Sequence, residues 1–271
     1  MTYDDGDIYF HHKKDKIDTG IIKTRAGSTF GLYGSINGHS VYKVEGVDYH
    51  LNPGSILLIR PAEVHIMQIL PDVYHERIVV FLSKRLLSKI DPDGVLLSAY
   101  NNRALGKLNL YNPEEFTHNP LERIMAMCAP GLTAAQRRVT IIANSLMLLH
   151  EIQFLFTQKK RKDKTQNDPL VNAVSEYINQ NLSENITMPS LSKRFFLSAS
   201  QLERKFKNVM GLSVGQYLTI KRMVSAKIML DDGVAPGEAC ASCGYKNYTS
   251  FYKAYKKYFG ISPSMKASEP T

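Results

Sequence analysis

One group of side chains in the last third of the chain is suited to contacting the bases and phosphates of a nucleic acid. Glu203, Arg204 and Lys207 follow Ser200 at i+3, i+4 and i+7, so the four side chains share one face of a helix. A guanidinium can donate two hydrogen bonds to N7 and O6 of guanine, whereas an ammonium group contacts mainly phosphates. Arg204 is therefore the first candidate for a base edge. Glu203 has two possible roles: its carboxylate can accept a hydrogen bond from a cytosine amino group, or it can form an ion pair with Arg204. We favour the ion pair.

A second group of the same chemical kind occurs further along the chain. Its members can form hydrogen bonds, stack or carry positive charge; they are Tyr248, Thr249, Tyr252, Lys253 and Lys256. Lys253 and Lys256 suit phosphates, and Thr249 and Tyr252 promise weaker base discrimination than Arg204. We expect the first group to supply most of the specificity and the second mostly anchoring. The alternative is a solvated basic face on an ordinary amphipathic helix.

The elements that must position these groups form an internal repeat. Ser198, Leu202 and Phe206 recur 49 residues later as Asn247, Phe251 and Tyr255, and a Gly and a Ser follow in the same register. Ser198 and Asn247 are helix caps, and the Leu, Phe and Tyr positions are spaced to face a core. Ser213 with Gln216, and Ser198 with Gln201, are capping-box pairs. The pattern predicts two helix-turn-helix units joined by a connecting helix that ends near Leu230.

The repeat resembles the DNA-binding domain of AraC/XylS family transcriptional regulators. The resemblance rests on Leu202 to Lys207, Gly211-Leu-Ser, Tyr217, Arg222, Ala226, Leu230, Cys243-Gly-Tyr, and the stretch from Tyr255 to Pro263. It implies a sequence-specific regulator that binds double-stranded DNA as a homodimer and contacts RNA polymerase if it is an activator. Two recognition helices so joined can enter successive major grooves about 34 Å apart.

The charge distribution agrees with a DNA-binding half. The chain carries 34 Lys and Arg against 25 Asp and Glu, a net charge of +9. From Lys159 onward there are 18 basic and 9 acidic residues, so the whole excess lies in that part. No apolar run approaches the roughly 18 residues of a membrane span, and the start is acidic rather than that of a secretory signal. We expect a cytoplasmic protein that binds no membrane.

The first 110 residues are typical of short strands and turns. A hairpin is expected around Gly46 within Val41 to Leu51, a buried strand over Ile56 to Ile59, and another strand from Arg77. The segment Pro53 to His65 resembles the cupin-type sensor domain of sugar-responsive members of the same family. The predicted fold class is α+β with two domains: an N-terminal cupin-like β-barrel with dimerisation helices, and a C-terminal all-α double helix-turn-helix.

A barrel of this size can hold one small ligand. The expected effector is a sugar or sugar derivative, by family resemblance, and the polar candidates to contact it are Arg25, Tyr33, Tyr42, His65, His75 and Arg77. No His occurs from Thr24 to Phe30 to join His65, so we expect no metal and no cofactor. Cys240 and Cys243 supply only half of a tetrahedral site and are interpreted as small core residues.

The segment between the two halves is expected to be helical and then extended. Thr133 caps a long helix with a stripe from Val139 through Leu149 to Phe156, and a second stripe of Ile141, Leu148 and Leu155 repeats every seven residues. One face can cover the barrel while the other meets a partner chain or stays within this chain. The predicted boundaries are 1–158 for the sensing and dimerisation domain, 159–167 for a basic linker and 168–271 for the DNA-binding domain.

Two other functions compete with a ligand-controlled regulator. A ligand-independent DNA-binding dimer would use the N-terminal half only to dimerise. A barrel enzyme fused to a DNA-binding domain would need a metal triad or an acid/base pair, and His65 and His75 lack a matching set. We therefore predict a regulator and not an enzyme.

Overall fold

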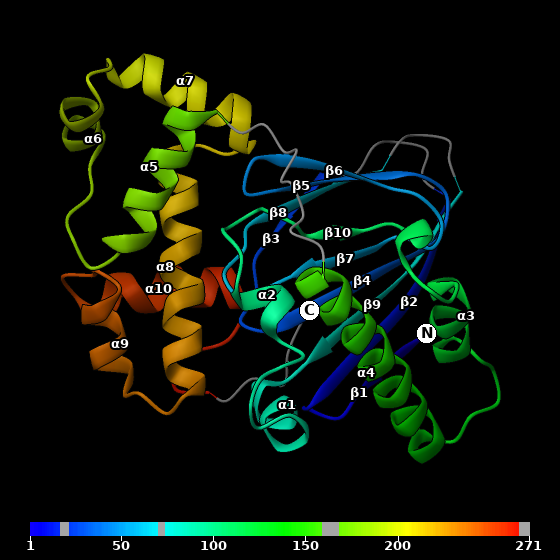
Figure 1. Ribbon diagram of the computed structural model, residues 1–271. Helices are drawn as coiled ribbons and strands as arrows, with labels where there is room; N and C mark the ends of the chain where they lie inside the picture. Colours follow the sequence, from blue (N-terminus) through cyan, green and yellow to red (C-terminus); the bar gives the residue numbers. More distant parts are fainter. Residues whose placement is uncertain (17–21, 70–73, 159–167, 266–271) are drawn as a thin grey trace.

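A computed structural model describes residues 1–16, 22–69, 74–158 and 168–265. A sheet-rich N-terminal domain lies beside an all-helical C-terminal domain (Figure 1). This is the predicted α+β fold class. The predicted basic linker, 159–167, lies outside the described residues.

Two antiparallel sheets build the described part of the N-terminal domain. The first has the strand order β1-β2-β9-β4-β7-β10 and the second β3-β8-β5-β6. The strands are β1 (Thr2–Asp4), β2 (Ile8–Lys16), β3 (Ile22–Arg25), β4 (Phe30–Asn37), β5 (Ser40–Val44), β6 (Val47–Leu51), β7 (Ile56–Ile59), β8 (His65–Ile69), β9 (Tyr74–Leu82) and β10 (Leu110–Tyr111). The predicted hairpin at Gly46 is β5–β6, and the predicted buried strand is β7.

The first sheet is buried on both faces. Successive residues of β4 alternate between two cores, because strand side chains point to opposite faces: Leu32 packs toward the helices, and Tyr33 packs between the two sheets. Leu57 and Ile59 of β7 likewise join the core between the sheets, while their neighbours face the helices. This double burial explains why β7 is a continuous apolar run.

Helices cover the outer face of the first sheet. They are α1 (Lys84–Ile90), α2 (Ser98–Asn101), α3 (Pro120–Met127) and α4 (Ala134–Gln158), with a 3₁₀ turn η1 (Pro113–Glu115). The seven-residue stripe Ile141, Leu148 and Leu155 is buried in the core beneath α4, as expected. The other stripe is mixed, because Val139 at its start is 64% exposed whereas Leu149 is buried.

By length and composition, α4 is apolar enough to cross a membrane. Residues Ala134–Thr157 have a mean hydropathy of 1.5, although polar and charged residues interrupt them and, as expected, no uninterrupted apolar run reaches 18 residues. One third of that window is buried within the protein. The face with Ile141 and Leu148 packs on the sheet core, which accounts for much of its apolar character.

Six helices form the described part of the C-terminal domain. They are α5 (Pro169–Gln180), α6 (Met188–Phe195), α7 (Ala199–Met210), α8 (Val214–Asp231), α9 (Pro236–Ser242) and α10 (Tyr248–Phe259). The capping boxes predicted at Ser198 with Gln201 and at Ser213 with Gln216 are both formed. Asn247 caps α10 by accepting from the backbone N–H of Ser250. Gly211 and Gly260 end α7 and α10 in the left-handed conformation that favours glycine.

The helix α8 connects the two helix-turn-helix units and also docks on the N-terminal domain (Figure 1). Lys221 and Tyr217 on this helix both bond to the carboxylate of Glu45, in the turn between β5 and β6. Val64 and Ile66 of the N-terminal domain join the apolar core of the first unit. The interface is therefore both apolar and charged.

Candidate nucleic-acid interface

The first recognition helix, α7, separates a buried face from a polar face. Leu202, Phe206 and Met210 are at most 4% exposed and pack into the core of the first unit. Ser200, Arg204 and Lys207 are exposed, as their spacing predicts. The structure thus brings these three predicted side chains together on one accessible surface, where a duplex can reach them.

Glu203 has a different role from either that the sequence suggested. Its side chain is half-buried, and its carboxylate accepts a hydrogen bond of 3.3 Å from the backbone N–H of Val214. Val214 begins α8, and a negative charge there complements the helix dipole. No ion pair joins Glu203 to Arg204, both of which the structure describes, so the favoured ion-pair interpretation was wrong, and the guanidinium of Arg204 stays accessible.

The second recognition helix, α10, repeats this division. Phe251 and Tyr255 are at most 1% exposed in the core of the second unit. Tyr248, Thr249, Lys253 and Lys256 are exposed, and Tyr252 is half-buried. The rings of Tyr248 and Tyr252 lie 6.4 Å apart, so the first two turns of this face are aromatic and the later ones cationic.

The turns before the two recognition helices differ in chemistry. Gly244 has φ +75°, and a Cβ there would lie 2.6 Å from the carbonyl oxygen of Leu182, so only glycine fits. At the corresponding turn of the first unit, Phe196 has φ 55° and is 92% exposed. A bulky residue in the left-handed region is a strained one.

The two cysteines before the second recognition helix are packing residues. Cys240 and Cys243 are at most 5% exposed and belong to the core around Phe251. Burial raises the pKa of both thiols, which disfavours the thiolate needed for redox or metal chemistry. Within residues 1–16, 22–69, 74–158 and 168–265, no cluster of three or more His, Cys, Asp or Glu side chains is arranged to hold a metal ion.

Four of the predicted effector contacts lie around one interior point of the barrel. Tyr33, Tyr42, His75 and Arg77 line a small cavity that has no room for a water-sized molecule. Arg77 Nη1 lies 3.0 Å from His75 Nδ1, and the Tyr42 hydroxyl donates to the sulfur of Met67 at 3.0 Å. These contacts close the barrel interior in this conformation.

The remaining two predicted contacts lie at the β3–β8 pair. Arg25 is opposite His65 in the strand register, and the Tyr33 hydroxyl lies 3.1 Å from Nε2 of His65. His65 is therefore connected to the cavity through Tyr33. Two lining residues that the sequence did not single out, Ser35 and Ser40, have buried hydroxyls with no hydrogen-bond partner among the described residues.

The residues that hold the C-terminal domain against the N-terminal domain were also not predicted from the sequence. Glu45 is 4% exposed and Lys221 is 1% exposed, with 2.5 Å between carboxylate and ammonium. Lys221 also donates to the carbonyl of Ala62 at 2.6 Å. Burial, and next the charge of Glu45, raise the pKa of Tyr217 well above its ordinary value, so its hydroxyl donates at 2.6 Å. The sequence did contain one indication of this contact, a Lys that follows a Tyr by four residues, and so lies on the same face of the connecting helix.

Comparison with known proteins finds a family match within the C-terminal domain. A family model described as a helix-turn-helix domain matches residues 191–266, which include α7 through α10. The chain is 28% identical over 124 residues to the probable transcriptional regulator LumQ of Photobacterium leiognathi, covering 45% of this chain and 48% of LumQ. The chain thus spans about half the length of that relative.

One relative matches across both domains. The arabinose operon regulatory protein of Escherichia coli K12 is 24% identical over 244 residues, 85% of this chain and 77% of that protein. A crystal structure of an apo ToxT variant from Vibrio cholerae aligns over 97% of both chains with 9% identity and a TM-score of 0.44. A relative named as an operon regulatory protein thus matches most of the chain.

Proposed function

Since this chain belongs, by its paired helix-turn-helix domain, to the AraC/XylS family of transcriptional regulators, we propose that it is a sequence-specific DNA-binding regulator. The observation that carries the proposal is the pair of recognition helices, α7 and α10, each with a buried apolar face and an exposed polar, cationic one. The relatives' names favour a regulator over an enzyme. The proposed domains are 1–158 and 168–271 with 159–167 as linker.

The two helices read successive major grooves of about 34 Å spacing. Arg204 contacts a base edge, with guanine as the natural target, because its guanidinium is exposed and is not paired with Glu203. Lys207, Lys253 and Lys256 contact phosphates. Ser200, Tyr248, Thr249 and Tyr252 add hydrogen bonds and apolar contacts to sugars and bases.

We propose the barrel as the effector site. A matched relative is named for the arabinose operon, and the effector is accordingly a sugar or sugar derivative. The unpartnered hydroxyls of Ser35 and Ser40 beside His75 and Arg77 suit a polar ligand, because a buried polar group without a partner is costly. A ligand would have to displace side chains to enter.

The closed barrel favours a second candidate function, a DNA-binding dimer without an effector. Its test is a comparison of DNA affinity with and without a panel of sugars. An unchanged affinity throughout, with no shift in thermal unfolding, favours the ligand-independent dimer.

The exposed face of α4 supports a homodimer in either case. Val139, Met147 and Phe154 are 64%, 49% and 55% exposed along this helix, and exposed apolar patches mark interaction sites. The protein acts in the cytoplasm, without a membrane, and contacts RNA polymerase if it activates. Light scattering of the wild type and of Met147→Glu measures the dimer; a monomeric wild type would contradict it.

The DNA-binding proposal is tested by selecting fragments of the source genome with the full-length protein and measuring affinities by gel shift. We expect an enriched sequence bound at least ~1,000-fold more tightly than random duplex. Equal affinity for the enriched and random duplexes would reject a sequence-specific regulator.

A further inference from the structure

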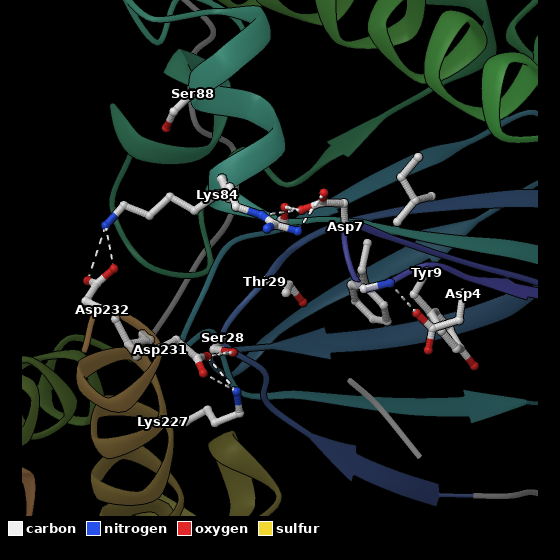
Figure 2. A pocket seen from close by; sticks show the side chains of 16 residues that line it. Asp4, Asp7, Tyr9, Ser28, Thr29, Lys84, Ser88, Lys227, Asp231 and Asp232 are labelled. Carbon is white, nitrogen blue, oxygen red and sulfur yellow. Dashed lines mark hydrogen bonds and ion pairs between the residues drawn. The ribbon is translucent and has the colours of Figure 1, made fainter. Parts of the chain in front are cut away.

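A cavity of about 490 Å³ lies between the two domains, on the side of the barrel where β1 turns into β2. Figure 2 shows Asp7 and Tyr9 on one wall, Lys84 and Ser88 from α1 above, and Lys227 with its neighbours from the end of α8 on the other wall. We call this cavity the interdomain cleft. Its volume falls in the range of small-molecule pockets, roughly 300–1,000 Å³.

The walls of the interdomain cleft carry charges of both signs, and each cation among them is already paired with a carboxylate. Lys84 bonds to both carboxylate oxygens of Asp232 at 3.1 and 3.2 Å, across the domain boundary. Lys227 bonds to Asp231, which also accepts from the Ser28 hydroxyl at 3.2 Å. Because each cation has a carboxylate partner, the cleft presents neither a free anion site nor a free cation site among these pairs.

On the barrel wall, Asp7 is held in the same way. Partial burial alone would raise its pKa, but hydrogen bonds from Ser83 and Arg85 keep the pKa below its ordinary value. Ser83 donates at 2.6 Å, and Arg85 donates at 3.0 and 2.8 Å. The carboxylate is therefore ionised at neutral pH and retains acceptor capacity, because an ionised carboxylate has about four lone-pair sites.

The cleft also has an aromatic wall. The rings of Tyr9 and Phe81 lie 5.7 Å apart with a 32° tilt, and both side chains are half-buried. Ile228 of α8 lines the cleft as well. Partly accessible rings offer flat apolar contact area beside the polar groups, the usual composition of a small-molecule site.

We propose that the interdomain cleft binds a neutral, hydroxyl-rich small molecule that contacts both domains at once. Hydroxyl groups both donate and accept, so such a ligand can bond to the carboxylates of Asp7 and Asp231 and to Lys84 without breaking an ion pair. An anionic ligand would have to displace a carboxylate from its cation and leave it uncompensated. A cationic ligand would find one carboxylate without a cation among the described residues, that of Asp4 at the exposed edge of the cleft. The carbon skeleton lies against Tyr9 and Phe81.

This site is separate from the barrel site proposed above. A ligand that touches Asp7 on one domain and Asp231 on the other binds only while the domains are docked, so it stabilises that arrangement by its differential affinity. The interdomain cleft thus links ligand occupancy to the position of α8.

The test is calorimetric titration and thermal unfolding of the full-length protein with myo-inositol, D-glucose and sucrose. D-glucosamine and D-glucuronate are the charged counterparts of the same ring. We expect saturable binding of at least one neutral probe, with at least tenfold weaker binding of the anionic ring, D-glucuronate. Binding of a charged ring alone, or of none of the five, overturns the proposal.

Two variants assign the site. Ser28→Tyr fills the interdomain cleft and should reduce the affinity at least tenfold, whereas Ser40→Ala, inside the barrel, should leave it unchanged. If Ser28→Tyr does not fold, Asp231→Asn replaces it, with an expected three- to tenfold loss. Loss of binding in Ser40→Ala with retention in the cleft variant assigns the ligand to the barrel and overturns the proposal. DNA affinity, measured separately, tests the proposed function independently.

Discussion

The carboxylate of Glu45 and the ammonium group of Lys221 meet at 2.5 Å, fully shielded from water, although 176 residues separate them. Each belongs to a different domain. A buried charge is tolerated only with a partner, because removing one partner leaves the other uncompensated. This pair makes the docking of α8 on the β5–β6 turn specific.

Glu45→Gln should loosen that docking, because Lys221 is left without a counter-charge at a cost of about 3–5 kcal/mol. We expect a larger radius of gyration by solution X-ray scattering and faster amide exchange in α8. Adding Lys221→Met to Glu45→Gln should restore compactness. Lys84→Met removes an exposed interdomain pair and should cost at most about 1 kcal/mol. An unchanged radius and unchanged exchange in Glu45→Gln would contradict this role.

Arg204→Ala should weaken binding to the enriched sequence by ~1–3 kcal/mol and relax the preference at one base pair. Lys256→Ala should weaken specific and random duplexes alike and lower the salt slope by about 1. Gel-shift titrations at several salt concentrations measure both effects. Equal losses on specific and random DNA for Arg204→Ala would remove it from the base-reading set.

Phe196→Gly should stabilise the protein. The left-handed backbone conformation destabilises a residue with a side chain by roughly 1–2 kcal/mol, and glycine removes this strain. The greater conformational entropy that glycine loses on folding offsets about 0.5–1 kcal/mol of that gain. Phe196 is 92% exposed, so its removal loses little burial. Scanning calorimetry should show a rise in Tm of roughly 1–3 °C. Phe196→Ala keeps the strain and serves as the control; an equal gain in both variants would mean that the backbone is not the cause.

Arg103→Ala should strongly destabilise the barrel, because Arg103 and Glu63 form an ion pair with both side chains fully buried. We expect a loss of about 3–5 kcal/mol in the free energy of unfolding at pH 7. Arg138→Ala, which breaks an exposed pair with Asp5, should cost at most about 1 kcal/mol. Denaturant titrations measure both.

The same pair gives a pH dependence. Burial raises the pKa of Glu63, but the charge and hydrogen bonds of Arg103 outweigh it, so the folded-state pKa lies below the ordinary 4.5. The stabilisation of the folded state by ionised Glu63 is therefore fully present above pH 4.5 and is lost as the pH falls through the folded-state pKa. Arg103→Ala should raise the pKa of Glu63, because the carboxylate then keeps only the longer ion pair with Arg60 at 3.8 Å and hydrogen bonds from Asn109 and the backbone, and the loss of stability should shrink at low pH. A deficit independent of pH would contradict the assignment.

Local signals predicted much of this fold. The hairpin at Gly46 and the caps Ser198, Ser213 and Asn247 depend on residues within a few positions of one another, and all are present. The interdomain contacts were not predictable in this way. Glu45 was an ordinary turn residue in the sequence, because its partners Tyr217 and Lys221 are 172 and 176 residues away.

The candidate site shows the same limit. Spacing alone identified the exposed Arg204 and Lys256. It could not show that Glu203 turns toward Val214, because that contact depends on how α7 meets α8. Nor could it show that Tyr33 and Tyr42 close the barrel interior, which is a matter of volume and not of residue type.

The connecting helix α8 determines the rotation of the two helix-turn-helix units relative to one another as well as the distance between them. Its 18 residues extend roughly 27 Å, and each residue added or removed rotates the second helix-turn-helix unit relative to the first by about 100°. The DNA duplex presents its grooves with its own fixed period, so a single-residue change in α8 would turn one recognition helix away from the face of the duplex that the other meets. Binding both recognition helices to one face of a duplex therefore requires a fixed length of α8, and the contact of the same helix with Glu45 connects this requirement to the N-terminal domain.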